Sequence, residues 1–493
     1  KMKNAAVIGA GIGGLTAAIR LAAAGYKVVV YEAGSKAGGK ANEFTMDGFR
    51  FDTGPSLLTM PFVADQLFAT VGKKREEYLE FLPLSVICKY FYPSGRILNA
   101  YADHDRFSKE IEEKTGDSAQ SVRNYFAYCK QIYDTAAPLF LFKPFSEYQT
   151  FLNREALKTL LNIGKMDVLR TMHQANASFF TDPDVIQLFD RYATYNGSSP
   201  YLAPATLNII QWVEYGMGGY TIKGGIYRLT AALVRLAEEL QVEIRYKSPV
   251  QKIVTEGNSV TGVEVHGTQE RYSLVISNAD TGYTFDTLVG GGEHKESRRN
   301  RKAGTSTSAL VLYAGIKGSF PQLEAHNIFF SGDYRKEFRQ LFEENRIPDD
   351  PTIYLYTSSR FNQNDAPEGC ENWFIMINTP AMRKPIDVET LNRIRHTLIS
   401  RLSQHLQTDV ESLIVSEKIM TPYDLQQNTM SPGGAIYGIS SNNRMAAFLR
   451  QPNRSKVYRN LYFAGGSAHP GGGIPLVMLS GMITADIILQ RES

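Results

Sequence analysis

Three glycines near the start of the chain have the spacing that dinucleotide-binding loops use. Gly9, Gly11 and Gly14 form the pattern G-x-G-x-x-G, and Glu32 follows the last of them by eighteen positions. In such a loop the first glycine permits a tight turn, the second lets the backbone approach a pyrophosphate, and the third lets the helix pack against the strand. An acid at the position of Glu32 accepts hydrogen bonds from a ribose and disfavours a 2′-phosphate. The pattern predicts an adenosine-containing dinucleotide, with an ordinary glycine-rich βαβ turn as the alternative.

A strand, a helix and a second strand must hold these residues in place. The apolar residues from Ala5 predict the first strand, a helix begins at about Ile12, and Val28–Tyr31 forms the second strand directly before Glu32. The N-terminus of that helix carries free N–H groups and the positive end of its dipole, so we expect it to point at the phosphates.

The other end of the chain repeats the arrangement. Leu461–Ala464 predicts a buried strand, Gly465-Gly466 allows close approach, and Gly471–Gly473 opens a helix. Two such units suit one long cofactor, with the adenosine diphosphate at one and the far phosphate and ring at the other. A helix N-terminus near a flavin pyrimidine ring would stabilise the negative charge that reduction places there. The alternative is a glycine loop that serves packing alone.

A second glycine loop, Gly38-Gly39, follows the acid. Lys40 after it is placed near the pyrophosphate or flavin, or else is a solvated lysine. Phe44–Met46 and Phe49–Asp52 predict a hairpin around an Asp-Gly turn.

Composition narrows the class of protein. The chain is 43% hydrophobic and 21% charged, which is typical of an ordinary folded protein, and its 493 residues suggest about three domain-sized units or one large two-domain enzyme. A net charge of +3 is too small to argue for nucleic acid. The three cysteines have no metal-binding spacing and fit a reducing cytoplasm, and no metal site is expected. No secretory signal and no uninterrupted run of 18 apolar residues is visible, and Ile474–Leu489 is predicted to be a packed helix.

The middle of the chain is predicted to be mostly helical between residues 151 and 215, and mixed from residue 242 onward. A capping box at Asp117 and Gln120 predicts a helix through Ile132. Ala137–Phe145 is very apolar and interrupted by prolines, which argues against a long helix there. Exposed, this block would touch a membrane; buried, it would be a core loop.

Segments at both ends and in the middle resemble the flavoprotein amine-oxidase and carotenoid-desaturase superfamily. They are GAGIGGLTAAIRLAAAGYKVVVYEA from Gly9, the Gly38-Gly39-Lys40 loop, FDTGPS from Phe51, and AGGSAHPGGGIPLVMLSG from Ala464. Within that superfamily, His469–Pro475 (HPGGGIP) resembles the bacterial phytoene-desaturase-like branch. Arg191–Leu207 (RYATYNGSSPYLAPATL) resembles the 1-hydroxycarotenoid 3,4-desaturases, with the diapophytoene-type desaturases close behind. No lysine can be assigned to the flavin-facing position of the amine oxidases, which weakens an amine-oxidase assignment.

The resemblance implies an α/β fold: a discontinuous Rossmann-like FAD-binding domain, a mixed-sheet substrate domain and a helical cap. The FAD domain would comprise residues 1–72, 220–285 and 420–493, the substrate domain 73–105 and 286–419, and the cap with its membrane contact 106–219. At the nucleotide half, the resemblance implies that FAD is held by the first turn, Gly9, Gly11, Ile12, Gly13 and Gly14, with Glu32 on the ribose and Val250 offering backbone hydrogen bonds to adenine. Along the pyrophosphate and ring it implies Lys40, Ser56 and Leu57, with Asn278 near the cofactor. Gly466, Gly473 and Ile474 would border the pyrophosphate or ring.

The implied activity is FAD-dependent desaturation of 1-hydroxylated acyclic carotenoids at the 3,4 bond, by hydride transfer to the flavin. A side-chain base is not obligatory; Glu214 is the candidate for proton handling, or else a helix-surface acid. Arg191 and Tyr195 would hydrogen-bond a substrate hydroxyl, or are structural. The alternatives are a phytoene or diapophytoene-type desaturase, a flavin-dependent carotenoid isomerase, and a non-catalytic carotenoid-binding flavoprotein.

The implied partners are a lipophilic substrate and the membrane that holds it. We expect a cytoplasmic protein that lies on the membrane surface without spanning it, with Leu139–Phe142 beside Lys143 as the mouth. Phe145, Phe151, Phe179 and Phe180 would continue into a tunnel. Electrons would pass to oxygen or a membrane quinone, because no second dinucleotide fingerprint is visible.

Overall fold

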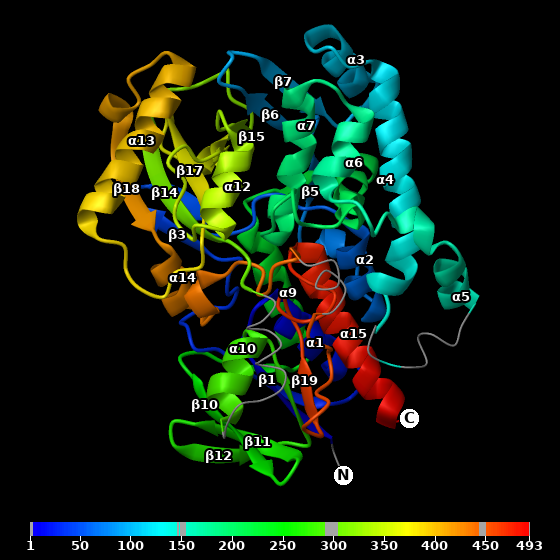
Figure 1. Cartoon of the computed structure of the whole chain (residues 1–493). Coiled ribbons are helices and arrows are strands. Elements are labelled where there is room, and N and C mark those ends of the chain that lie inside the picture. Colours follow the sequence, from blue (N-terminus) through cyan, green and yellow to red (C-terminus); the bar gives the residue numbers. More distant parts are fainter. Residues whose placement is uncertain (1–2, 145–146, 148–153, 291–303, 443–449, 493) are drawn as a thin grey trace.

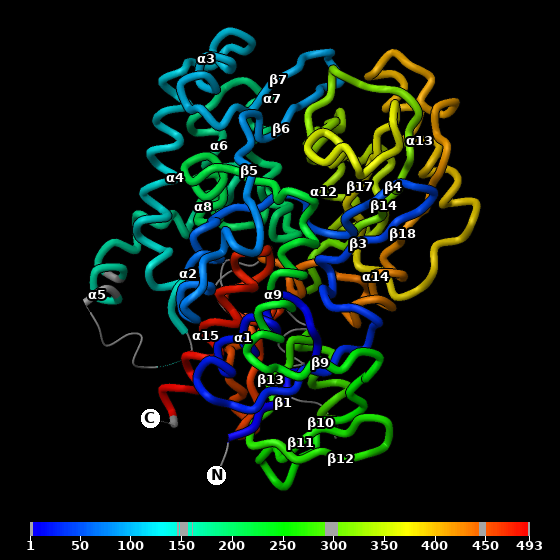
Figure 2. Tube along the Cα trace, turned by 180° about the vertical axis from the view of Figure 1, so that it is seen from behind, coloured from blue at the N-terminus to red at the C-terminus, as the bar shows by residue number. Residues whose placement is uncertain are grey.

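The computed structural model describes residues 3–144, 147, 154–290, 304–442 and 450–492. Figure 1 shows three parts: a parallel sheet with its helices at the lower end, a larger mixed sheet at the upper left, and a group of helices at the upper right. Both termini leave the molecule from the lower part, as Figure 2 shows from behind.

The lower part is built on five parallel strands in the order β19-β13-β1-β2-β9. They are β1 (Asn4–Ile8), β2 (Lys27–Tyr31), β9 (Glu243–Arg245), β13 (Leu274–Ser277) and β19 (Leu461–Phe463). The central strands are buried on both faces, as parallel strands usually are. Because β13 pairs with both β1 and β19, the first and last strands of the chain lie in one sheet with a single strand between them.

Alternate residues of these strands face two different layers. Val7 and Val30 pack with helices, whereas Ile8 and Val29 pack with a second sheet. The helices are α1 (Ile12–Ala23), α2 (Phe62–Thr70), α9 (Tyr227–Glu239) and α15 (Ile474–Glu492). The second sheet holds β10 (Val250–Glu256), β11 (Ser259–Val265) and β12 (Thr268–Arg271), with α10 (Thr281–Tyr283) and the π-helix η7 (Thr284–Val289) beside it.

The two glycine-led helices cross closely. A Cβ on Gly481 of α15 would lie 2.4 Å from the carbonyl oxygen of Gly13 in α1, so no larger residue fits at the crossing. By length and mean hydropathy (1.3), Ile474–Arg491 of α15 could cross a membrane, yet 61% of it is buried in the protein. The structure therefore uses α15 as a core helix, in agreement with the sequence prediction.

The mixed sheet has seven strands in the order β18-β14-β17-β16-β15-β6-β7, and only the β15–β6 pair is parallel. They are β6 (Val86–Phe91), β7 (Ile97–Tyr101), β14 (Ser308–Lys317), β15 (His326–Phe329), β16 (Ile353–Tyr356), β17 (Cys370–Thr379) and β18 (Ile414–Met420). Helix α13 (Val388–Leu406) packs on one face, and the predicted hairpin β3 (Glu43–Met46) and β4 (Phe49–Asp52) packs on the other. A short ribbon of β5 (Phe81–Pro83) and β8 (Tyr220–Ile222), and helices α12 (Tyr334–Phe342) and α14 (Pro422–Thr429), complete this region.

The helical part covers the β6 and β15 end of that sheet. It contains α3 (His104–Lys114), α4 (Ala119–Phe140), α5 (Arg154–Leu161), α6 (Met172–Phe179), α7 (Pro183–Asp190) and α8 (Ile209–Gln211), the 3-10 turns η3 (Ile163–Met166), η4 (Arg191–Asn196) and η5 (Ala205–Asn208), and the π-helix η6 (Trp212–Gly216). Its core is strongly aromatic; Tyr125, Phe180 and Phe189 lie within 5.1 Å of one another, measured between ring centroids.

Helix α4 differs from its prediction at both ends. Ser118, not Asp117, caps its N-terminus, and the Asp117 carboxylate instead accepts N–H bonds from Thr181 and Asp182. At the other end the helix continues to Phe140 with Pro138 inside it, because the buried Ala137 and Leu139 hold that turn against the core.

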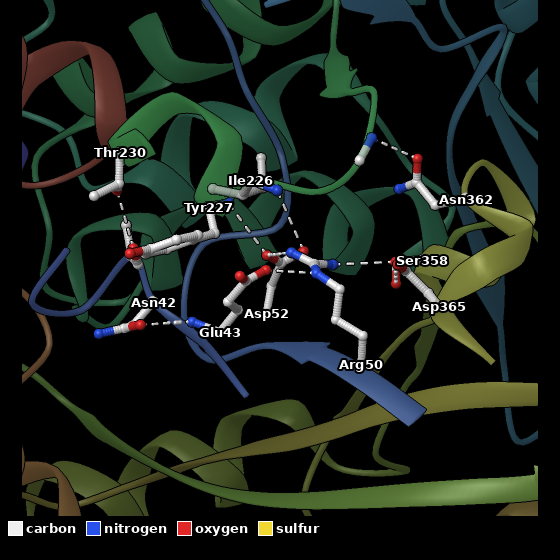
Figure 3. A network of polar contacts seen from close by, with 12 residues as sticks. Asn42, Glu43, Arg50, Asp52, Ile226, Tyr227, Thr230, Ser358, Asn362 and Asp365 are labelled. Carbon is white, nitrogen blue, oxygen red and sulfur yellow. Dashed lines mark hydrogen bonds and ion pairs between the residues drawn. The ribbon is translucent and has the colours of Figure 1, made fainter. Parts of the chain in front are cut away.

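A buried ionic network joins the hairpin to its surroundings (Figure 3). Arg50 contacts Glu43 at 2.5 Å, Asp52 at 2.7 Å and Asp365 at 3.1 Å. Asp52 in turn accepts the free N–H groups of Ile226 and Tyr227 at the start of α9, each at 3.3 Å. The network therefore ties the hairpin both to α9 of the lower part and to the loop before β17.

Candidate cofactor site and the buried polar cluster

Asn278 lies at the junction of the two glycine turns. It follows β13, the strand between β1 and β19, and its Nδ2 lies 3.4 Å from the carbonyl oxygen of Gly9. A Cβ on Gly11 would lie 2.7 Å from that nitrogen, and a Cβ on Gly465 would lie 2.6 Å from the Asn278 Oδ1. The structure therefore brings both glycine motifs against one side chain.

The first turn has the form that a pyrophosphate requires. Gly11 is the N-cap of α1, its backbone is extended, and no side chain caps the helix. A Cβ on Gly14 would lie 2.3 Å from the Gly9 carbonyl oxygen, so this glycine permits the close strand–helix packing predicted for it. Ile12 and Gly13 are buried in the first turn of α1. The free N–H groups of that turn remain available to an anion.

Glu32 is fixed at the end of β2. Its carboxylate accepts the backbone N–H of Ala10 at 2.8 Å and that of Gly34 at 2.7 Å, one on each oxygen. Ser248 donates its backbone N–H to the Glu32 carbonyl, so the segment leading to Val250 runs beside the acid. The predicted ribose and adenine contacts thus come from neighbouring segments.

Lys40 is partly buried in the loop beside Gly11. Its Nζ donates to the carbonyl oxygens of Ala435 at 3.0 Å and Ile436 at 2.8 Å. Burial lowers the pKa of Lys40 to about 8, although the negative charge of Asp280 opposes that shift. The lysine is therefore not a simple solvated residue.

A second buried cation lies at the other turn, where no sequence motif pointed to it. Arg450 is 5% exposed, and its Nη1 donates to the carbonyl oxygens of Tyr437 at 2.7 Å and Gly466 at 3.2 Å. Its Nη2 is buried and has no hydrogen-bond partner among the residues that the structure describes. Burial lowers the pKa of Arg450 to about 10.

The remaining residues predicted for the second turn lie at the start of α15. A Cβ on Gly473 would meet no atom within 4 Å, and Gly466 has only ordinary van der Waals neighbours. Ile474 is the buried first residue of the helix. Open space thus lies directly in front of this helix terminus.

Ser56 and Leu57 connect the cofactor side to the mixed sheet. The Ser56 Oγ lies 2.5 Å from the hydroxyl of Tyr354, which lies 2.7 Å from Nδ1 of His326. The Leu57 side chain packs beside Gly219. A buried hydrogen-bonded chain therefore runs from the FDTGPS loop to β15.

Arg191, Tyr195 and Glu214 meet in one buried cluster under the helical part. Tyr195 donates its hydroxyl to Glu214 at 2.6 Å, and Tyr192 does the same at 2.6 Å on the other oxygen. Arg191 donates Nη2 to the Tyr90 hydroxyl at 2.9 Å and lies 4.0 Å from Glu214. Glu214 is 1% exposed, so the alternative that it is a helix-surface acid is wrong. It occupies a π-helix, a distortion frequent at functional sites.

His326 faces this cluster from β15. In the parallel β6–β15 register Lys89 pairs with Asn327, so Cys88 and His326 lie on the sheet face that also carries Tyr90. Burial, and then the charge of Arg191, lower the pKa of His326 to about 3, so the ring is neutral. Within the described part of the chain, its Nε2 and the Arg191 Nε are both buried without a hydrogen-bond partner.

The structure agrees with the predicted membrane mouth only in part. Leu139 is 1% exposed and belongs to the core, whereas Phe140–Phe142 are partly exposed and the Phe142 ring packs 6.2 Å from that of Phe62, so the membrane contact stays a prediction. Phe180 is 2% exposed and stacks on Phe189 in the aromatic core, so it lines no open tunnel. Phe179, also proposed for the tunnel, is packed 5.4 Å from Tyr125. Phe145 and Phe151 lie outside the described residues.

A family model described as flavin containing amine oxidoreductase matches residues 12–489. The chain belongs to this family. The flavoprotein is 40% identical over 487 residues to a protein named 1-hydroxycarotenoid 3,4-desaturase from Flavobacterium sp. (strain P99-3), with 99% of each chain covered. It is 34% identical to a 4,4'-diapolycopene oxygenase from Methylomonas sp., with 98% of this chain and 97% of that one covered. The solved structure of cyclohexylamine oxidase from Brevibacterium oxydans IH-35A matches over all of both chains with a TM-score of 0.62 at 15% identity, a likeness of fold alone.

These findings confirm the carotenoid-desaturase-like resemblance, the amine-oxidase-type fold and FAD as the cofactor. The flavoprotein is an FAD-dependent oxidoreductase. The residues present fit that cofactor: an uncapped helix N-terminus lies at the first turn, a fixed acid stands at the end of β2, and a partly buried lysine and a buried arginine lie at the two turns. The individual contacts predicted to FAD stay predictions.

Proposed function

We propose that the flavoprotein introduces the C-3,4 double bond into 1-hydroxylated acyclic carotenoids. The relative that is 40% identical over the whole chain carries that activity in its name. The structural observation that supports it is the buried cluster around Arg191, which has unused hydrogen-bonding capacity inside an otherwise aromatic region. Such capacity suits a lipid with one polar group.

The two unpartnered atoms of the cluster match the chemistry of a hydroxyl. The Arg191 Nε–H can only donate, and the neutral His326 ring leaves Nε2 free either to donate or to accept. A hydroxyl both accepts and donates, so it is chemically suited to either atom. Buried polar atoms without partners are rare in proteins, and a ligand is one reason for them.

The position of this cluster agrees with the bond that would react. The hydroxyl is on C-1, only two carbons from C-3, so its binding residues must lie near the flavin. The Ser56–Tyr354–His326 chain links the cluster to the loop predicted to follow the cofactor. Tyr192 and Tyr195 hold Glu214 between them, and Glu214 balances the charge of Arg191.

FAD, when bound, would supply the two-electron oxidant for a desaturation in which one carbon loses a hydride and the adjacent carbon a proton. The chain's residues orient the end group and exclude water. Glu214 is the carboxylate available to move that proton through Tyr195. Oxygen or a membrane quinone would then accept the two electrons.

The test is mass analysis of the product. Purified holoenzyme in liposomes receives a 1-hydroxylated acyclic carotenoid or its deoxy analogue. We expect loss of two hydrogens from the hydroxylated substrate and a kcat/KM ratio of at least ~100 in its favour, because a site built for a hydroxyl rejects an analogue without it. Arg191→Met should lower kcat/KM only for the hydroxylated substrate. Equal rates on both substrates in the wild type would refute hydroxyl recognition.

A second candidate activity is oxygenation, because the relatives at 34% and 33% identity are named diapolycopene and diaponeurosporene oxygenases. The same experiment separates the candidates. Oxygenation adds the mass of oxygen, isomerisation leaves the mass unchanged, and activity on the deoxy substrate alone would favour a phytoene or diapophytoene-type desaturase. Anaerobic assays with a quinone identify the acceptor.

We also propose that the flavoprotein binds the membrane surface through α5 and the turn after it. Leu157, Leu161, Ile163 and Leu169 are 60%, 78%, 50% and 72% exposed, and we call them the α5 surface. Lys158 and Lys165 are exposed among them, which suits anionic lipid headgroups. Figure 1 shows α5 projecting from the side of the helical part. This surface differs in position from the mouth predicted at Leu139–Phe142.

A further inference from the structure

Arg450 carries a buried positive charge that no acidic side chain among the described residues neutralises. Among the described residues, no carboxylate lies within ion-pair distance of its guanidinium. The two carbonyls that accept its hydrogen bonds, those of Tyr437 and Gly466, carry only partial negative charge. A buried, uncompensated charge is costly, so a side chain of this kind is retained where an anion joins it.

The surroundings of Arg450 fix the guanidinium at the second glycine turn. Gln451 pairs with Ala468, so residues from Arg450 run alongside the loop that leads to α15. Asn453 braces that loop by donating to the His469 carbonyl at 2.8 Å. A Cβ on Gly471 would lie 3.0 Å from the Arg450 Nε.

The N-terminus of α15 also lies at the second glycine turn. Figure 1 shows this helix running from the centre of the molecule, where the three parts meet, down to the C-terminus. Its first turn faces the open space at Gly473, and Pro475 in that turn contributes no N–H of its own. The positive end of the α15 dipole and the Arg450 guanidinium therefore both lie at the second glycine turn.

Lys40 is the corresponding cation on the side of the first turn. It contacts the carbonyls of Ala435 and Ile436, and Arg450 contacts the next carbonyl, that of Tyr437. Lys40 has Asp280 nearby, whereas Arg450 has no such acid among the described residues. The two cations thus lie at the two glycine turns, and the less compensated one is at the second turn, which is predicted to take the ring.

We propose that Arg450 is the electrostatic partner of the flavin ring: its guanidinium compensates the negative charge of reduced FAD and raises the reduction potential of the bound cofactor. A hydride brings two electrons and one proton to the ring, which thereby gains one negative charge, and Arg450 stays protonated throughout. This role depends on FAD alone and not on the identity of the carotenoid.

The experiment measures the reduction potential of the purified holoenzyme against a reference dye, without substrate. Arg450→Gln should lose at least tenfold in the preference for reduced over oxidised FAD, which is a fall of about 30 mV for a two-electron couple. Arg450→Lys keeps the charge and should retain most of the potential. Lys40→Met is the matched control, since it removes a cation that contacts the same segment, residues 435–437, and should weaken FAD binding with a smaller change in potential.

A measurement on the wild type keeps the proposal testable should Arg450→Gln not fold. With a cation at the ring, reduction takes up one proton for two electrons between pH 6 and 8, so the potential should fall about 30 mV per pH unit. A slope near 59 mV would show a neutral reduced ring and overturn the proposal. An unchanged potential in Arg450→Gln with weakened FAD binding would overturn it as well, because Arg450 would then serve the pyrophosphate.

Discussion

Replacing Leu157 and Leu161 by serine should release the flavoprotein from lipid bilayers. Complete burial of a leucine side chain is worth roughly 1.5–3 kcal/mol. These two are 60% and 78% exposed, so that fraction of each remains to be transferred into lipid. Together they contribute roughly 3 kcal/mol, which is about a hundredfold in the partition coefficient at 1.4 kcal/mol for each tenfold.

Co-sedimentation with liposomes measures this coefficient directly. Vesicles with and without an anionic lipid separate the apolar contribution from that of Lys158 and Lys165, and added salt should weaken only the second. Because both leucines are exposed, the double variant should keep its FAD and its thermal stability.

The matched control is a double variant with serine at Val388 and Val415, which are 71% and 54% exposed on α13 and β18 of the mixed sheet. It removes exposed apolar surface of the same kind from another part of the molecule. An equal loss of lipid binding in the control, or none in the α5 variant, would show that the α5 surface is not the contact.

Three further outcomes are expected. Gly11→Val should abolish FAD binding, so that the purified protein is colourless. The new Cβ would lie 2.7 Å from the Asn278 side-chain nitrogen, and the valine methyls would fill the space of the pyrophosphate. The control Gly116→Val, where the Cβ enters open space, should stay yellow. The affinity of the wild type for FAD, measured by fluorescence titration, should fall as pH rises through about 8, because Lys40 loses its proton there and no longer attracts the pyrophosphate. Lys40→Met should bind FAD more weakly at pH 6, and its affinity should not fall near pH 8. Arg50→Met should lower the free energy of unfolding in urea by roughly 3–5 kcal/mol, because the buried Asp52 is left unpaired; a loss below 1 kcal/mol would show that the network is not stabilising.

Local signals in the sequence were sufficient for most of the framework. Strand and helix periodicity, with glycine turns, predicted β1, α1, β2, the β3–β4 hairpin and the strand–helix unit at the C-terminus. The glycines of both turns were singled out because close backbone approach leaves few other choices of residue.

The parts that sequence reasoning missed depend on tertiary contacts. Nothing local marks Arg450 or His326, since each gains its meaning from burial beside segments distant in the chain. The continuation of α4 through Pro138 was missed because burial outweighed the usual effect of proline. The exposed leucines of α5 look like any amphipathic helix until the structure shows that their face is uncovered.

The placement of β13 between β1 and β19 has a consequence for biosynthesis. The sheet cannot be completed until β19, which begins at Leu461, has left the ribosome. The N-terminal segment emerges first, so its glycine turn after β1 would form before the glycine turn after β19 exists. Until then, Asn278 would contact only the first of these two turns. Loading of the yellow cofactor must therefore wait for β19, and a chain terminated before Leu461 should accumulate in the apo form.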